Sequence, residues 1–339
     1  MTVPASRRFQ FAPDLAICRV LNGMWQVSGA HGRIDPERAV AAMFDYHNAG
    51  FTTWDLADHY GPAEDLIGRF HERFAAQRGA ERLDEIQAFT KWVPYPGPMS
   101  RQTVEQAIAV SLRRMRVECL DLLQFHWWDY GDRRYLDALK HLADLKQEGR
   151  IRHLALTNFD TEHLSIIVDA AIPIVCNQVQ YSLVDRRPAA KMAAFCREHG
   201  IALLTYGTLL GGLLSENYLG RPEPGRSELT TASLQKYKNM IDAGGGWALF
   251  QELLAALKPI ADKHRAGIAN IGTRYVLDRP AVAGVIIGAR LGIAEHVADN
   301  ARVLDMVFDA DDLAAVEPVL AKSRDLMRLI GDCGDEYRR

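Results

Sequence analysis

The stretch Gly50-Phe-Thr-Thr-Trp-Asp55-Leu-Ala-Asp-His-Tyr60-Gly61 places an acid and a phenol directly after a short apolar run. A helical pattern of apolar residues begins soon afterwards, near Ala63. Two later apolar runs also end on chemically useful side chains, Lys91 and His126. In an α/β barrel the carboxyl ends of the parallel strands carry the catalytic groups. The sequence therefore predicts that these side chains meet at one end of such a barrel.

Short apolar runs alternate with amphipathic segments along the chain. Runs that are apolar on both faces are typical of buried parallel strands. Strands are expected at Ala16–Val20, Phe51–Asp55, Ile86–Thr90, Leu120–Phe125, His153–Thr157, Ile174–Gln178, Ala202–Tyr206 and Val282–Ile287. Helices are expected at Pro36–Ala49, Ala63–Gln77, Arg101–Met115, Tyr135–Glu148, Glu162–Ala171, Ala189–His199 and Trp247–His264. Asp35 and Pro36 supply a helix start, and Gly149 and Gly200 supply helix ends.

This alternation over 339 residues favours a single (β/α)8 TIM barrel, residues 1–339, over a doubly wound sheet or two domains. No Gly-x-Gly-x-x-Gly follows the first run, so the usual dinucleotide fingerprint of a doubly wound fold is absent. We expect an extended irregular loop over Ser215–Gly246, after the seventh strand, because it contains two prolines and a group of glycines. We also expect one C-terminal helix and a polar tail over Ala310–Arg339.

The composition, 48% apolar and 24% charged, is that of a globular protein. A formal net charge of −3 gives no support for binding nucleic acid. No segment approaches the roughly 20 apolar residues of a membrane span, and Met1 to Leu15 lacks the apolar core of a secretory signal. An odd number of cysteines without a Cys-x-x-Cys pair predicts reduced thiols and a cytoplasmic protein. Most should be buried, with Cys333 the most exposed.

Five segments resemble the signatures of the aldo-keto reductase family, in that family's order. They are Asp55–Gly61, Asp121–His126, Gly149–Phe159, Asn177–Ser182, and Ile287–Arg290 followed by Glu295, His296 and Asn300. The chain is identified by this resemblance as a member of the family. The resemblance implies a TIM barrel that reduces an aldehyde or ketone to an alcohol by hydride transfer. It implies NADPH as the cofactor, with NADH less favoured.

The resemblance also assigns catalytic roles. Hydride transfer builds negative charge on the carbonyl oxygen, which then needs a proton donor, and this is Tyr60. Lys91, held by Asp55, would lower the pKa of the phenol, because a nearby cation favours phenolate. His126 would orient or polarise the carbonyl oxygen as a neutral imidazole. Taken singly, each residue has another interpretation: a structural ion pair, a packing tyrosine or a core histidine.

The cofactor contacts carry over by position. Thr157, Asn158 and Gln178 match residues that hold the nicotinamide carboxamide, and Tyr206 matches the aromatic ring beneath it. Arg290 would pair with the adenosine 2′-phosphate, which favours NADPH. The remaining expected contacts are Gly23, Met24, Trp25 and Asp55; Gly207, Thr208, Leu209, Gly211 and Gly212 of a pyrophosphate-binding turn; and Gly288, His296 and Asn300.

The substrate pocket is predicted from aromatic residues after the first, third and fourth strands. They are Trp25, Trp92, Trp127 and Trp128, of which one or two are expected to be scaffold. His59 either lines the mouth or makes a local hydrogen bond. The loop Ser215–Gly246 either closes over the pyrophosphate or is only an insert.

Other functions stay open. The same groups serve oxidation of an alcohol or sugar, and a cofactor-binding sensor or adaptor would resemble the β subunits of potassium channels. A metal-dependent barrel hydrolase could use Asp55, His59 and His126, but no third ligand cluster is visible, so no metal is predicted. The expected partner is a small carbonyl or alcohol, with no nucleic acid and no membrane; the sequence indicates neither the substrate nor the oligomeric state.

Overall fold

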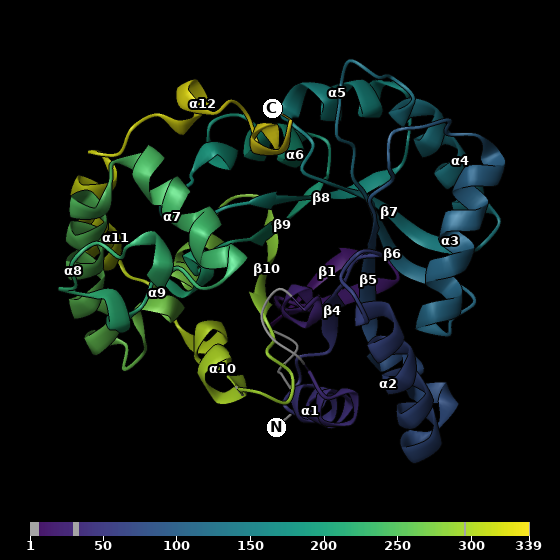
Figure 1. The fold of residues 1–339 in the computed structure, drawn as a ribbon, viewed down its shortest axis with the longest axis horizontal. Helices are drawn as coiled ribbons and strands as arrows, with labels where there is room; N and C mark the ends of the chain where they lie inside the picture. Colours follow the sequence, from purple (N-terminus) through teal and green to yellow (C-terminus); the bar gives the residue numbers. More distant parts are fainter. Residues whose placement is uncertain (1–6, 30–33, 295, 339) are drawn as a thin grey trace.

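The protein is described by a computed structural model that covers residues 7–29, 34–294 and 296–338. Parallel strands close into a barrel in the order β10-β3-β4-β5-β6-β7-β8-β9, and helices surround it (Figure 1). The strands are β3 (Val20–Gly23), β4 (Thr53–Asp55), β5 (Gln87–Trp92), β6 (Leu120–Phe125), β7 (Ile151–Thr157), β8 (Ile174–Gln180), β9 (Ala202–Tyr206) and β10 (Val282–Gly288). The predicted (β/α)8 fold class is confirmed.

The helices that cover the barrel are α1 (Pro36–Asn48), α2 (Ala63–Arg78), α3 (Arg101–Met115), α4 (Tyr135–Gln147), α5 (Thr161–Asp169), α6 (Met192–Glu198), α7 (Ala232–Gly244), α8 (Trp247–Lys263), α9 (Ile268–Leu277), α10 (Val297–Asp305), α11 (Ala310–Leu320) and α12 (Leu326–Leu329). The first six helices and α8 fall on predicted helices, whereas α9 and α10 were not predicted. The Asp35 carboxylate accepts from two backbone N–H groups of the first turn of α1, as predicted for an N-cap. Gly149 and Gly200 follow helix ends with φ values of 77° and 66°, which glycine adopts without strain.

The first predicted strand, Ala16–Val20, is wrong in its boundaries. Leu15–Cys18 forms β2, which pairs antiparallel with β1 (Arg8–Ala12), and the barrel strand starts only at Val20. The break falls at Arg19, whose guanidinium donates to the carbonyls of Leu277, Val282 and Ala283 and so leaves the strand pattern. The hairpin packs its apolar side chains against the barrel interior and closes the amino-terminal end.

Two irregular segments are more ordered than the sequence predicted. Ser215–Gly246 contains α7, which starts where the Thr231 hydroxyl accepts from Leu234 N. After α11 and α12 the chain returns towards the barrel and ends near α5 and α6 (Figure 1). The prediction that Cys333 is exposed is wrong, since its exposed fraction is 1%. The tail is held down because the buried Arg187 guanidinium donates to Asp332 O at 2.9 Å.

The barrel interior changes from apolar to polar along the strands. Phe89, Leu122 and Cys176 belong to an apolar cluster inside the barrel. Side chains alternate along a strand with a period of two, so the next inward positions are Lys91, Gln124 and Gln178. This alternation concentrates buried polar groups at the carboxyl ends of the strands.

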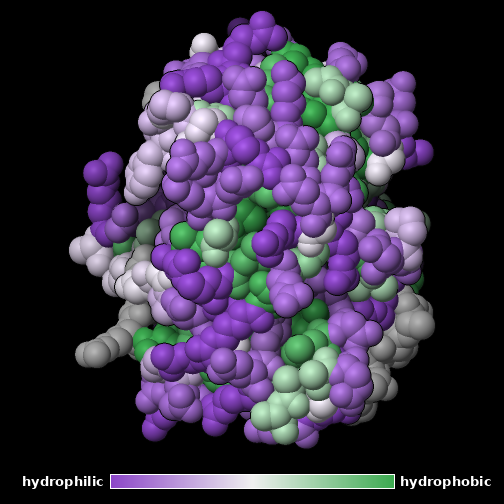
Figure 2. All heavy atoms as spheres, turned by 90° about the vertical axis from the view of Figure 1, so that its right-hand side faces the viewer, coloured by the Kyte–Doolittle hydropathy of each residue, from purple (hydrophilic) through white to green (hydrophobic). Residues whose placement is uncertain are grey.

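The outer surface follows the amphipathic pattern of the helices. Figure 2 shows the face that carries α2, α3 and α4: hydrophilic residues dominate it, and apolar atoms appear in the gaps between them. Across the described ranges, no helix is both long enough and apolar enough to cross a lipid bilayer. The five cysteines are free thiols, four of them buried.

Candidate active site

Asp55 and Lys91 form a buried ion pair at the carboxyl ends of β4 and β5. Lys91 Nζ donates to Asp55 Oδ2 at 2.6 Å and to Leu56 O at 2.8 Å. Both side chains are almost completely buried, with 4% exposed. Burial lowers the pKa of Lys91, while the Asp55 carboxylate opposes that effect. The pair therefore fixes one positive charge beneath the barrel mouth.

Gln124 belongs to this site, although the sequence analysis did not assign it a role. Its Nε2 donates to Asp55 Oδ1 at 3.0 Å, and Gln178 Nε2 donates to the same oxygen at 2.7 Å. Gln178 also donates to Gln124 Oε1 at 2.6 Å. Both Asp55 oxygens are thus used, one by Lys91 and one by two amides. The period-two alternation that brings Lys91 inward could have identified Gln124, its partner in the β5–β6 register.

Tyr60 lies in the loop after β4, over the ion pair. Lys91 Nζ is 5.0 Å from the centroid of the Tyr60 ring. The predicted lowering of the phenol pKa by Lys91 is one contribution to the pKa of Tyr60, and it stays a prediction. Burial is the main cause that raises the pKa of Tyr60 well above its usual value, and the Asp55 charge adds to the rise. Tyr60 therefore keeps its proton at neutral pH, as a proton donor must.

His126 follows β6 and faces the same space. Its Nδ1 is 3.2 Å from Thr157 O, and because a carbonyl oxygen only accepts, Nδ1 carries the proton. Burial lowers the pKa of His126 to about 4, so the ring is neutral, as predicted. Nε2 is buried and has no hydrogen-bond partner among the described residues. In this tautomer Nε2 offers a lone pair to a ligand.

The expected carboxamide contacts lie together at the ends of β7, β8 and β9. Asn158 follows Thr157 with a left-handed φ of 60°, and its Oδ1 accepts from the Tyr206 hydroxyl at 2.7 Å. The Thr157 hydroxyl donates to Gln178 O at 3.4 Å. Polar groups that would hold a carboxamide are thus paired with one another and must exchange partners when a ligand binds.

The turn after β9 is rich in glycine, so a ligand could come close to the protein backbone there. Gly207, Gly211 and Gly212 have φ values of 78°, 69° and 103°. The buried hydroxyl of Thr208 has no partner among the described residues, so it can donate to a phosphate oxygen. This is the turn that the sequence predicted to bind a pyrophosphate, and Leu209 lies within it.

The residues expected to contact the adenosine half of the cofactor lie at the end of β10 and after it. Gly288 pairs in register with Gly23, whose carbonyl accepts from Ala289 N, and the buried Met24 follows. Arg290 is exposed, and none of the described carboxylates forms an ion pair with it. His296 is exposed before α10, and Asn300 is buried on that helix. Glu295, part of the family resemblance, lies outside the described residues.

The predicted tryptophan wall is only partly present. Trp92 and Trp127 are buried in the aromatic layer around Phe125, outside the barrel, so their assignment to the pocket is corrected to scaffold. Trp128 is 40% exposed, with its ring centroid 4.4 Å from that of His126. Trp25 is partly buried beyond β3.

His59 has the local hydrogen bond that the sequence analysis proposed as one of two roles. Its Nδ1 is 2.8 Å from Asp58 Oδ1, and its ring lies edge-on to Tyr60 with centroids 4.8 Å apart. Its side chain is 54% exposed. His59 therefore borders the mouth and is oriented by Asp58.

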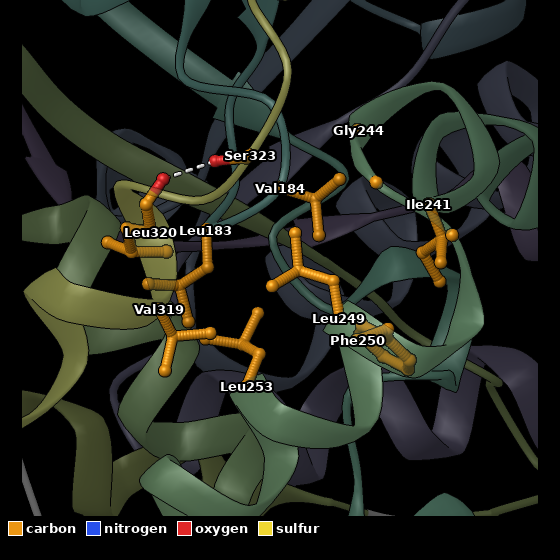
Figure 3. Close-up of a pocket in the computed structure, with 12 residues that line it drawn as sticks. Leu183, Val184, Ile241, Gly244, Leu249, Phe250, Leu253, Val319, Leu320 and Ser323 are labelled. Atoms are coloured by element: carbon orange, nitrogen blue, oxygen red, sulfur yellow. Dashed lines mark hydrogen bonds between the residues drawn. The ribbon is translucent and has the colours of Figure 1, made fainter.

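A separate apolar pocket lies between α7, α8 and α11 (Figure 3). Figure 3 shows Leu183, Leu253 and Val319 around it, and its one drawn hydrogen bond joins the Ser323 hydroxyl to Leu320 O. The pocket has no ionisable side chain and none of the predicted site residues. Within the described part of the chain, no three His, Cys, Asp or Glu side chains are grouped to hold a metal ion.

Comparisons with known proteins show the family and the fold of this chain. The model of the Aldo/keto reductase family matches residues 19–321. Flagellar radial spoke protein 5 of Chlamydomonas reinhardtii is 33% identical over 260 residues, 66% of this chain and 49% of that protein, so the chain spans about half of that relative. The NADH-specific methylglyoxal reductase of Escherichia coli (strain K12) is 22% identical over 316 residues, 88% of this chain and 93% of that protein. An aldo/keto reductase from Klebsiella pneumoniae, solved in complex with NADP and acetate, has a TM-score of 0.69 and 22% identity, over 93% of this chain and 95% of that chain.

Proposed function

Because the chain belongs to the aldo/keto reductase family, we propose that it reduces an aldehyde or ketone to an alcohol with a nicotinamide cofactor and Tyr60 as proton donor. One observation carries the proposal. A buried Asp55–Lys91 pair lies beneath the Tyr60 ring, and His126 Nε2 faces the site without a described partner. An acid, a fixed cation and a polar orienting group are what proton delivery to a carbonyl oxygen requires.

The cofactor proposed is NADPH. The glycine turn and the unpartnered Thr208 hydroxyl suit a pyrophosphate, and the exposed Arg290 suits a 2′-phosphate. The Klebsiella pneumoniae structure contains NADP, whereas the Escherichia coli relative is NADH-specific. Arg290 is therefore the residue on which the preference for NADPH is tested. When bound, the nicotinamide supplies the hydride that adds to the carbonyl carbon.

Proton transfer follows from the positions of the side chains. Burial holds the proton on Tyr60 until negative charge develops on the substrate oxygen. The phenolate left behind is stabilised by the Lys91 ammonium, whose own position is fixed by Asp55 and Leu56 O. The same residues take a proton from an alcohol in the reverse reaction.

The tautomer of His126 favours oxidation of an alcohol as a second candidate activity. With its Nδ1 proton donated to Thr157 O, Nε2 accepts a hydrogen bond from a hydroxyl and cannot donate to a carbonyl oxygen. Contact with a carbonyl oxygen requires the Nε2–H tautomer, which gives up the bond to Thr157. The kcat for alcohol oxidation and the kcat for carbonyl reduction, each measured at saturating substrate in the wild type and His126→Gln, test this preference.

The decisive experiment measures NADPH-dependent carbonyl reduction in the wild type, Tyr60→Phe and Tyr95→Phe. Tyr95 is 91% exposed in the loop after β5 and provides a matched phenol deletion. We expect Tyr60→Phe to lose at least about 10²-fold in kcat while still binding NADPH, since general acid catalysis contributes about 10²–10⁴-fold. Tyr95→Phe should retain activity. Full activity in Tyr60→Phe would refute Tyr60 as the donor, and cofactor binding without any turnover in the wild type would favour a sensor or adaptor.

A further inference from the structure

We propose that Lys236 and Tyr337 form an anion-binding subsite in the barrel mouth, which receives a carboxylate or phosphate group carried by the substrate. The inference rests on the proposed carbonyl reduction and adds a substrate class to it. Lys236 lies on α7, within the segment expected to be an irregular loop, and Tyr337 lies in the C-terminal tail. These two residues meet only in the tertiary structure.

Tyr337 lies next to groups of the active site. Its ring centroid is 6.1 Å from that of His126, and its hydroxyl oxygen is 3.0 Å from the Tyr206 hydroxyl oxygen. A phenol has one proton, and Tyr206 donates its proton to Asn158 Oδ1. Tyr337 must therefore donate to Tyr206. The Lys236 ammonium donates to the Tyr337 oxygen, so a chain of hydrogen bonds runs from Lys236 to Asn158.

The Lys236 ammonium is held by neutral groups. Its Nζ lies 4.8 Å, 5.3 Å and 4.7 Å from the ring centroids of Tyr206, Tyr237 and Tyr337, within the range of cation–π attraction. Its hydrogen-bond partner in the described ranges is the Tyr337 oxygen, and no carboxylate there forms an ion pair with it. An ammonium has three N–H donors, so two remain for a ligand. An anion would provide the opposite charge that this partly buried cation lacks.

Neighbouring cations, unlike Lys236, are paired with carboxylates. Lys238, two residues further along α7, pairs with Glu223 and with Asp242 at 2.6 Å. Arg187, which anchors the tail, pairs with Asp185 at 2.8 Å and with Glu336 at 3.0 Å. Glu336, whose charge helps to raise the pKa of Lys236, is thus already in an ion pair with another cation. The contrast indicates that the positive charge of Lys236 is available to an anionic ligand in the barrel mouth.

The position of Lys236 limits the shape of the substrate. The Tyr337 ring is near both groups: its centroid is 4.7 Å from the Lys236 ammonium and 6.1 Å from the centroid of the His126 ring. A substrate that reaches both must carry its anionic group several bonds away from its carbonyl. Trp128, which lies edge-on to His126, provides an apolar wall for the intervening atoms. An aldehyde with a remote carboxylate or phosphate therefore fits best.

Binding to the full-length protein tests the subsite without relying on turnover. Benzoate and its neutral amide, benzamide, are compared by calorimetry on the wild type, Lys236→Met, Lys236→Arg and Lys258→Met. Lys258 lies on α8 in an ion pair with Asp262 and controls for the loss of one positive charge. We expect the wild type and Lys258→Met to prefer benzoate, and Lys236→Met to lose that preference by about tenfold or more. Lys236→Arg should keep most of the preference for benzoate. Equal binding of the two probes by the wild type would overturn the proposal.

Turnover of para-carboxybenzaldehyde and its neutral analogue para-formylbenzamide distinguishes this inference from the proposed function. A fall in kcat/KM for the anionic aldehyde that is about tenfold larger than the fall for the neutral aldehyde in Lys236→Met supports the subsite. An equal fall for both aldehydes, or a fall in NADPH affinity alone, contradicts it. If the wild type reduces neither aldehyde but Lys236→Met still loses selective benzoate binding, the proposed function fails for these carbonyls and the subsite stands.

Discussion

The neutral state of His126 predicts a specific dependence of stability on pH. Burial lowers its pKa from 6.5 to about 4 in the folded protein. Between these values the unfolded chain takes up a proton that the folded chain refuses, so stability falls as pH falls. At about 1.4 kcal/mol per pKa unit, the loss between pH 7 and pH 4 is about 3 kcal/mol. The loss levels off below the folded pKa, where both states are protonated.

Urea denaturation of the wild type and His126→Asn at pH 7, 6, 5 and 4 measures this contribution. Burial also lowers the pKa values of His47, His71 and His153, but their effects are common to both proteins and cancel in the difference. We expect the free energy of unfolding of the wild type, relative to the variant, to fall by about 3 kcal/mol over this range. Parallel curves for the two proteins would show that His126 titrates normally. That result would remove the argument for a neutral imidazole in the site.

Three further perturbations test other parts of the site. Arg290→Ala should weaken NADPH binding by about tenfold or more, measured by tryptophan fluorescence, and leave NADH binding unchanged; equal effects on both cofactors would contradict the 2′-phosphate contact. Gln124→Leu removes a donor to Asp55 and should cost about 1–3 kcal/mol in urea denaturation, with a lower kcat because the carboxylate loses one of its supports; unchanged stability and kcat would exclude a positioning role. Gly211→Ala should lower the thermal midpoint more than Gly212→Ala. Both glycines have left-handed φ values, but a Cβ on Gly211 would lie 2.9 Å from the backbone of α7, whereas a Cβ on Gly212 would meet no atom within 4 Å. Equal shifts in the midpoint would mean that α7 does not pack on the turn.

The sequence was sufficient for the repeating plan of the barrel. Leu120–Phe125, Ala202–Tyr206 and Arg101–Met115 have the boundaries that periodicity predicted, because these segments are long, regular and bounded by turn or cap residues. It failed at Ala16–Val20, where a long-range hydrogen-bonding arginine splits an apolar run between a hairpin and the barrel. The pattern of apolar and polar residues within one segment gives no information on a hydrogen bond to a distant segment.

The candidate site shows the same division. Asp55, Lys91 and Gln178 could be placed together because residues at strand ends of a parallel barrel point to one mouth. Trp92 is the last residue of β5 and Trp127 follows β6, but both pack outside the barrel, since alternation turns neighbouring residues to opposite faces. The raised pKa of the partly buried Tyr60 reflects desolvation by other elements of the fold, which no motif specifies.

Side-chain periodicity within single elements is enough to predict the eight-stranded alternation and most of the polar residues at its carboxyl end, although Gln124 was missed. It gives no sign that Arg187 anchors the C-terminal tail or that Tyr337 meets Lys236. Those two contacts form only in the folded chain, because they join residues that are 145 and 101 positions apart. They depend on how helices and loops pack onto the finished barrel, and a local pattern of apolar and polar residues carries no record of that packing.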